Sequence, residues 1–262
     1  MLKFFAHSDN DRNEIHPLAK HLLHTAQLSE NFSRCDRFRP LFRIAALLHD
    51  FGKYQPAFQN YLENGGRRGS VPHASWGAGY ARMLKLIEVS LVVDGHHKGL
   101  PDIATWRSDT NPYVHHDVAD FEQIKKNFLN DLKINESDFS ELQSPAFTNK
   151  SQHEIFVRYL FSALTDSDWL STEAHFESEK SELRIDQSLP IAEMLLKLDK
   201  EFDRKSKVGD VNQMRNDARN AAIKKALLSP GFYSLSLPTG MGKTLTSLGD
   251  RKSTRLNSSH RI

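Results

Sequence analysis

Apolar residues recur at helical spacing along most of the chain. Leucine and alanine follow this spacing between Pro17 and Phe32, and the segment Pro40–Phe51 is apolar on nearly every face. The first pattern predicts an amphipathic helix, and the second predicts a central buried helix that stops at Gly52. Further periodic segments predict helices over Pro56–Leu62, Ala74–Val93, His116–Leu132 and Gln152–Leu170, and the stretches 64–70, 95–112 and 135–150 predict loops between them.

The pattern changes after Trp169. The charged connection Glu173–Gln187 leads to an amphipathic segment, Ile191–Phe202, and then to a second helical segment around Val211–Leu228. Phe232–Leu237 alternates as a strand does and leads into a glycine-containing loop, which predicts the beginning of an α/β unit. We therefore expect a domain boundary between Glu173 and Val211.

Composition narrows the class of protein. The 262 residues carry a net charge of +2, with 26% charged and 39% hydrophobic residues. This globular balance argues against a disordered tail or a basic nucleic-acid coat. The single cysteine, Cys35, excludes an intramolecular disulfide and a thiolate-rich zinc cluster, and it fits a reducing cytoplasm. The sequence shows no secretory signal and no long apolar run, so we expect a cytoplasmic protein with no membrane partner.

Histidine is unusually frequent, with 13 residues in the chain. The sharpest arrangement is His49-Asp50, at the end of the predicted buried helix. An adjacent imidazole and carboxylate can bind one metal ion or bridge two, although the same pair could simply cap the helix and meet solvent. Other candidate ligands fall on or at the ends of predicted helices, so a helical bundle could bring them to one pocket; they are His21, His73, His96, His97, Asp166 and Asp168.

The order of these residues resembles a known family. The set His21, His49-Asp50, His73, His96-His97 and Asp168 is similar to the metal site of the HD phosphohydrolase superfamily. The sequence His-Asp-x-Gly-Lys, followed by a single histidine and then a His-His pair, resembles the HD nuclease domain of the CRISPR-associated nuclease-helicase of type I systems. The resemblance covers about residues 1–175.

The resemblance implies a function for each matching residue. Asp50 would be the catalytic carboxylate that bridges two divalent ions. His49 and His21 would complete one metal site, and a second site would be held by His73, His96 and His97.

Two further assignments follow from the resemblance. The last carboxylate of the family precedes a bulky residue, which matches Asp168 before Trp169 and leaves Asp166 as the competing assignment. Lys53 would face the scissile phosphate as a point charge, and the alternative is a solvated lysine just past a helix end.

We assign no ligand function to the other histidines up to residue 175. His24 is three residues from His21 and falls on a neighbouring face. His7 precedes any predicted element and is interpreted as part of the terminus. The rest have no motif support; they are His16, His115, His116, His153 and His175.

A second motif, Pro238-Thr-Gly-Met-Gly-Lys-Thr244, follows the predicted strand. Gly240 and Gly242 would let backbone N–H groups approach phosphate, Lys243 would reach the β- and γ-phosphates, and the Thr244 hydroxyl would hold magnesium. The strict phosphate loop has glycine where Leu237 stands, and this departure resembles helicase motif I. An HD nuclease domain followed by helicase motif I is the order of the CRISPR nuclease-helicase family.

The helicase part is expected to be truncated. A helicase needs a second acidic motif and a second motor domain, and only 18 residues follow Thr244. The tail 250–262 lacks the apolar pattern of a packed helix, so we expect foreign or disordered sequence there. One acidic and four basic residues give this tail +3, so residues 1–249 have a net charge of −1 and no overall attraction for DNA.

The sequence therefore predicts a mainly α protein. We expect an HD-superfamily helical bundle with nuclease activity at 1–180, a helical linker at 181–210, and the first strand and phosphate loop of a truncated α/β RecA-like helicase domain at 211–249. The resemblance implies cleavage of single-stranded DNA delivered by an RNA-guided CRISPR surveillance complex. Alternatives are an HD phosphohydrolase acting on nucleotides and a non-catalytic nucleotide-binding fragment.

The expected cofactors are two divalent metal ions. Mixed imidazole and carboxylate ligands favour transition metals such as manganese, nickel, cobalt or iron, with magnesium as the alternative. ATP with magnesium would be used only by the full-length protein, and we expect no ATP-driven unwinding by this chain.

Overall fold

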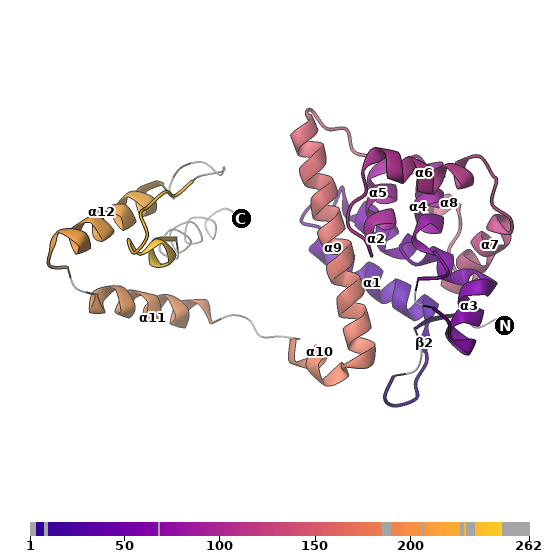
Figure 1. The fold of residues 1–262 in the computed structure, drawn as a ribbon, viewed down its shortest axis with the longest axis horizontal. Coiled ribbons are helices and arrows are strands. Elements are labelled where there is room, and N and C mark those ends of the chain that lie inside the picture. Colours follow the sequence, from indigo (N-terminus) through magenta and orange to yellow (C-terminus); the bar gives the residue numbers. More distant parts are fainter. Residues whose placement is uncertain are drawn as a thin grey trace. The chain divides into compact units, whose positions relative to one another are not determined.

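The computed structural model describes residues 4–7, 10–67, 69–184, 190–205, 207–225, 228 and 234–247. The chain divides into two units, Met1–Asp186 and Gln187–Ile262. Helices dominate the described part of each unit (Figure 1). The prediction of a mainly helical protein is confirmed.

The first unit is a helical bundle that begins with two short strands. The strands pair antiparallel, with His7 opposite His16. The elements in chain order are β1 (Phe5–His7), β2 (His16–Pro17), α1 (Leu18–Phe32), α2 (Arg39–Leu48), the 3-10 helix η1 (Phe51–Tyr54), α3 (Pro56–Asn64), α4 (Ala74–Met83), α5 (Ile87–Gly95), α6 (Ile103–Val114), α7 (Phe121–Leu132), α8 (Ser137–Ser140), α9 (Lys150–Phe176) and α10 (Ser178–Arg184).

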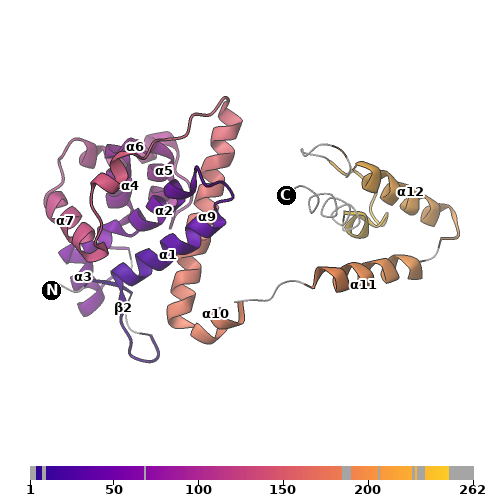
Figure 2. The ribbon, with the colours of Figure 1, turned by 180° about the vertical axis from the view of Figure 1, so that it is seen from behind.

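The core is built around α2. Leu41, Phe42 and every residue from 44 to 48 are buried, as expected for a helix that is apolar on nearly every face. Helices α1, α4, α5 and α9 all pack against it. The long helix α9 runs along one side of the bundle, where it contacts α1 and α5 (Figures 1 and 2). The carboxyl end of α2 is therefore surrounded by four other helices.

Two glycines allow a close approach at this end of α2. A Cβ atom on Gly77 of α4 would overlap the Leu48 carbonyl, and one on Gly52 of η1 would overlap the backbone of His73. Backbone segments can meet this closely only where no side chain separates them. The two glycines thus bring the beginning of α4 against the end of α2.

Four predicted boundaries in the first unit are wrong. The expected single helix over Ala74–Val93 is two helices, α4 and α5, because Lys85 between them has a left-handed backbone with φ of +62°. Helix α6 begins within the expected loop 95–112 and ends at Val114, and it carries Pro112 in its last turn. Proline there removes a single helical hydrogen bond. The expected helix at His116–Leu132 begins only at Phe121, and the charged connection contains α10.

The second unit contains α11 (Ile191–Arg204) and α12 (Asp210–Lys225), near the two predicted helices. The Arg219 guanidinium lies over the Phe202 ring, 4.4 Å from its centroid, and joins them. Residues 234–238 form no strand, because no described residue pairs with them. Phe232 and Tyr233, and the whole tail 250–262, lie outside the described residues. The RecA-like helicase fold therefore stays a prediction.

None of the helices in the described ranges combines the length and the apolar character needed to cross a membrane.

Candidate metal centre

The candidate centre lies where α2 ends. His49 is the residue that caps α2, and Asp50 follows it before η1 begins. His73 precedes α4, and His96 caps α5. His21 lies on α1 and Asp168 on α9. The bundle thus brings side chains from five helices to one place.

Backbone carbonyls orient two of the imidazoles. His49 Nδ1 lies 2.6 Å from the Ala46 carbonyl, and His96 Nδ1 lies 2.7 Å from the Val93 carbonyl. A carbonyl oxygen can only accept a hydrogen bond, so each Nδ1 must carry the proton and donate it. In the neutral ring, Nε2 is then left with a free lone pair, which is the arrangement of a metal-binding histidine.

The first cluster consists of His21, His49, Asp50 and Asp168. His21 Nε2 lies 3.3 Å from Asp50 Oδ2, 3.2 Å from Asp168 Oδ1 and 3.2 Å from His49 Nε2. His49 Nε2 lies 3.3 Å from Asp50 Oδ2 and 3.5 Å from Asp168 Oδ1. Ligands of a tetrahedral ion at 2.0–2.1 Å are spaced by roughly 3.3 Å. The spacing therefore fits one ion between these atoms.

The second cluster consists of Asp50, His73, His96 and His97, and one ligand atom from each lies within 4.8 Å of the others. His73 Nε2 is 3.4 Å from Asp50 Oδ1 and 3.0 Å from His97 Nε2. His96 Nε2 is 3.8 Å from the same Asp50 oxygen. This cluster is wider than the first, but three imidazoles and one carboxylate are a set that suits a transition metal.

Asp50 belongs to both clusters through different oxygens, because Oδ2 faces the first and Oδ1 the second. The residue is 1% exposed. Asp50 Oδ1 and His96 Nε2 are both buried and have no hydrogen-bond partner, which is costly for polar atoms. A cation in the second cluster would satisfy both atoms. The residues present therefore fit a pair of divalent ions with one shared carboxylate.

Charges shift the pKa values of the first cluster. Burial raises the pKa of Asp50, but Lys53 and His49 outweigh it and hold this pKa well below its usual range. Burial also raises the pKa of Asp168. The charge of His49 outweighs this effect, so the pKa of Asp168 lies well below its usual range as well. Burial lowers the pKa of His49, but Asp50 and Asp168 reverse this effect and raise it to about 10. The metal-free first cluster thus keeps two carboxylates ionised and a proton on His49.

The second cluster is different, since the imidazoles of His73 and His97 are neutral at pH 7. Burial is the main cause that lowers the pKa of His73 to about 3 and that of His97 to about 4. Neutral imidazole is the form that binds a metal ion.

Lys53 does not extend into solvent. It is 5% exposed, and its Nζ lies 2.7 Å from Asp50 Oδ2 and donates to the Ala6 carbonyl at 3.0 Å. The ammonium group therefore balances the charge of Asp50, and the alternative of a solvated lysine is wrong. Its contact with a scissile phosphate stays a prediction.

The structure separates the two aspartates that the sequence leaves in competition. Asp168 reaches the first cluster, whereas Asp166 is exposed on α9 and is part of no described metal-ligand cluster. Two residues along a helix turn about 200°, so both cannot face the same site.

The phosphate-loop residues lie in the second unit. Gly240 and Gly242 have left-handed φ values of +83° and +75°, and residues 243–247, which include Lys243 and Thr244, are helical. The Arg215 guanidinium of α12 donates to the Gly240 carbonyl. Nucleotide binding by this loop stays a prediction.

Sequence reasoning missed two features beside the first cluster. The buried Ser171 Oγ lies 3.1 Å from His21 Nδ1, one helical turn after Asp168. This spacing along α9 was the available signal. His7 and His16, which the sequence assigned no ligand function, lie against His21, and only the pairing of the two strands places them there.

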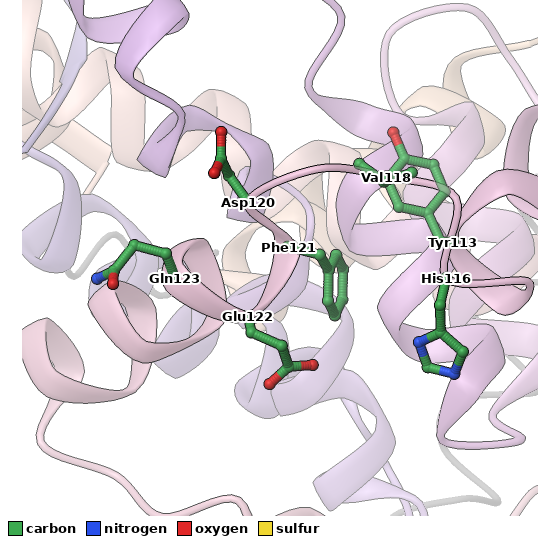
Figure 3. Close-up of a pocket in the computed structure, with 7 residues that line it drawn as sticks. All are labelled: Tyr113, His116, Val118, Asp120, Phe121, Glu122 and Gln123. Carbon is green, nitrogen blue, oxygen red and sulfur yellow. The ribbon is translucent and has the colours of Figure 1, made fainter.

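A separate pocket of about 210 Å³ lies between the end of α6 and the beginning of α7. Phe121 and Glu122 lie on one side of the view, and Tyr113 and His116 lie on the other (Figure 3). None of its lining residues belongs to either cluster, so this pocket is not part of the centre.

A scan against known protein families matches residues 18–114 to the HD domain. The matched residues begin with α1 and end with α6. They contain every cluster residue except Asp168. No curated protein matches the chain. Residues 18–114 of this chain therefore form an HD domain, the fold of metal-dependent phosphohydrolases.

Proposed function

We propose that the chain is a metal-dependent phosphodiesterase that cuts single-stranded DNA. The observation that carries the proposal is Asp50, whose two oxygens face two separate sets of imidazoles. Two-ion sites of this kind stabilise both the attacking and the leaving oxygen when a phosphodiester is cut.

Different residues of the proposed centre have different functions. Asp50 holds the two clusters together, and the carbonyls of Ala46 and Val93 fix the rings of His49 and His96. Bound divalent ions would supply the Lewis acidity that activates water and neutralises the phosphate. Lys53 adds a fixed positive charge beside Asp50.

Access to the centre supports a polymeric substrate. His97 is exposed, and the side chains of His73 and Asp168 are 15% and 17% exposed, whereas His21 and His49 are buried. The second cluster thus opens to the surface, where a long phosphate backbone can be laid across it. The net charge of −1 over residues 1–249 gives no general attraction for DNA, which supports delivery of the strand by a partner.

The order of the two motifs supports a CRISPR setting for this activity. The HD domain precedes a loop that resembles helicase motif I. We propose that an RNA-guided surveillance complex opens the target and that ATP-driven helicase activity feeds the strand to the HD centre. The chain itself should not unwind DNA.

Cleavage of linear and circular single-stranded DNA across a panel of divalent ions tests the proposal. We expect cutting with manganese, nickel, cobalt or iron and loss of at least about a hundredfold in Asp50→Ala, since a ligand shared by both ions is removed. Asp166→Ala is the matched control, because it removes an exposed aspartate near the centre and should cut as the wild type does.

Two outcomes would overturn the proposal. Cutting that survives Asp50→Ala unchanged would refute the assigned centre. Turnover of mononucleotides with intact single-stranded DNA would instead favour an HD phosphohydrolase acting on nucleotides.

A further inference from the structure

His7 and His16 form a small group of imidazoles beside the first cluster. The two residues face each other across the β1–β2 pair, and their rings stack with centroids 5.5 Å apart. Each ring also lies 5.1 Å from the ring of His21. A two-stranded ladder and the first turn of α1 thus bring three imidazoles together.

The nitrogens of these rings are spaced as potential ligands. One nitrogen from each of His7, His16 and His21 lies within 4.8 Å of the other two. This limit also describes the second cluster, so a similar closing movement would bring either set around one ion. The three residues contain no carboxylate, which distinguishes this group chemically from the two clusters that share Asp50.

His16 supplies a second observation that points to a ligand. It is 3% exposed, and its Nδ1 atom is buried with no hydrogen-bond partner. A buried nitrogen without a partner is unfavourable, and a cation would satisfy it. The contact of His7 Nε2 with Thr172 Oγ1 is long, at 3.4 Å, so this nitrogen is only weakly held.

We infer that His7, His16 and His21 form a third cation site, composed of imidazoles alone. Such a donor set suits Zn²⁺, Cu²⁺ or Ni²⁺ better than Mn²⁺ or Mg²⁺, which prefer oxygen ligands. The site therefore disfavours Mn²⁺ and Mg²⁺ more strongly than the carboxylate-containing clusters do.

The third site is weaker than the other two. Both nitrogens of His21 already have partners, because Nε2 faces Asp50 and Asp168 and Nδ1 contacts Ser171 Oγ. Binding an ion through His21 Nδ1 together with His7 and His16 breaks the Ser171 contact and releases the Nδ1 proton to solvent, so that His21 would hold two ions as an imidazolate. The ion at this site is accordingly the last to be bound and the first to be lost on dialysis.

Equilibrium dialysis of the full chain against Zn²⁺, followed by elemental analysis, tests the inference. We expect wild type to bind one more equivalent of Zn²⁺ at saturation than the double variant His7→Ala, His16→Gln. Dialysis against Mn²⁺ should give the same content in both proteins. His115→Ala, which removes an exposed imidazole at the end of α6, should bind as much Zn²⁺ as wild type.

The inference is overturned if the double variant retains the full Zn²⁺ content of the wild type. Where the double variant does not fold, the single variant His7→Ala decides, because His7 lies on a short strand at the edge and is only half-buried. It should weaken the last Zn²⁺ equivalent by at least about tenfold, and unchanged affinity would refute the site. The readout is ion content, so it does not depend on the proposed nuclease reaction.

Discussion

Ser171 fixes the ring of His21 from the far side of the first cluster. Its hydroxyl lies 3.1 Å from His21 Nδ1 and 3.4 Å from the His21 carbonyl. If the hydroxyl donates to the carbonyl, it accepts from Nδ1–H and leaves Nε2 for a metal ion. Removing a group that hydrogen-bonds to a metal-binding histidine typically lowers the metal affinity by about 10- to 100-fold.

We therefore expect Ser171→Ala to weaken Mn²⁺ binding at the first cluster by about 10- to 100-fold, measured by calorimetry. Ser162→Ala removes an exposed serine from the same helix and serves as the control. Equal affinities in the two variants would show that Ser171 does not orient His21.

Metal binding should depend on pH through His49. Asp50 and Asp168 outweigh the effect of burial and raise the pKa of His49 in the metal-free chain to about 10, so an ion must displace a proton at pH 7. Affinity should then rise with pH by up to about tenfold per unit between pH 6 and 8. Calorimetry in buffers of different ionisation enthalpy should detect about one proton released. An affinity that is flat over this range would contradict the assignment.

The approach of α4 to α2 rests on a missing side chain at Gly77. A Cβ atom there would overlap the Leu48 backbone, whereas one on Gly79 would meet the ring of Tyr113. A helical alanine gains about 1 kcal/mol over glycine, but overpacking costs about 1–3 kcal/mol when the neighbour cannot move. Backbone at the end of α2 has less freedom to move than a ring.

Gly77→Ala should therefore lower the free energy of unfolding by up to about 2 kcal/mol and also weaken metal binding, because His73 and His49 are pushed apart. Gly79→Ala should leave metal affinity near that of the wild type. Thermal melts and Mn²⁺ titrations of both variants give the comparison. Identical metal affinities would mean that the Gly77 contact does not position the centre.

Several elements could be predicted from the sequence because their signals are local. The apolar positions of α1, α2 and α9 and the proline at the beginning of α3 identify these helices directly. The left-handed backbone at Lys85 and the tolerance of Pro112 depend on packing, so the α4–α5 break and α6 escaped prediction. The strand expected near residue 235 has no partner strand among the described residues. Alternation of apolar and polar residues does not form a strand without such a partner.

The candidate centre was predictable for a related reason. Its residues lie at helix ends in a recognisable order, so His21, His49, Asp50, His73, His96 and His97 could be named together. The resemblance already favoured Asp168 over Asp166, and the rotation along α9 explains why only Asp168 reaches the first cluster. His7 and His16 could not be found, because the pairing of β1 with β2 is what brings them to His21.

At the scale of the whole molecule, every residue of the two clusters lies in the unit Met1–Asp186. The described buried core also lies within this unit. We expect a fragment of residues 1–186 to melt cooperatively and to bind as much Mn²⁺ as the full chain. Saturating Mn²⁺ at about 100 times its dissociation constant should add about 2.7 kcal/mol of stability.

Calorimetry and elemental analysis of the fragment check this expectation, with the Asp50→Ala fragment as the control that gains no such stability. A fragment that melts without a cooperative transition, or that binds less metal than the full chain, would show that the second unit is needed to complete the first.

Asp168 lies well beyond the residues that match the HD domain, and α9 supplies it to the first cluster. Synthesis exposes the N-terminal helices first. A nascent chain that has released α1 to α6 already holds all four residues of the second cluster, but the first cluster still lacks one carboxylate. The complete set of candidate metal ligands therefore forms late in translation, once α9 has left the ribosome and packed against the bundle.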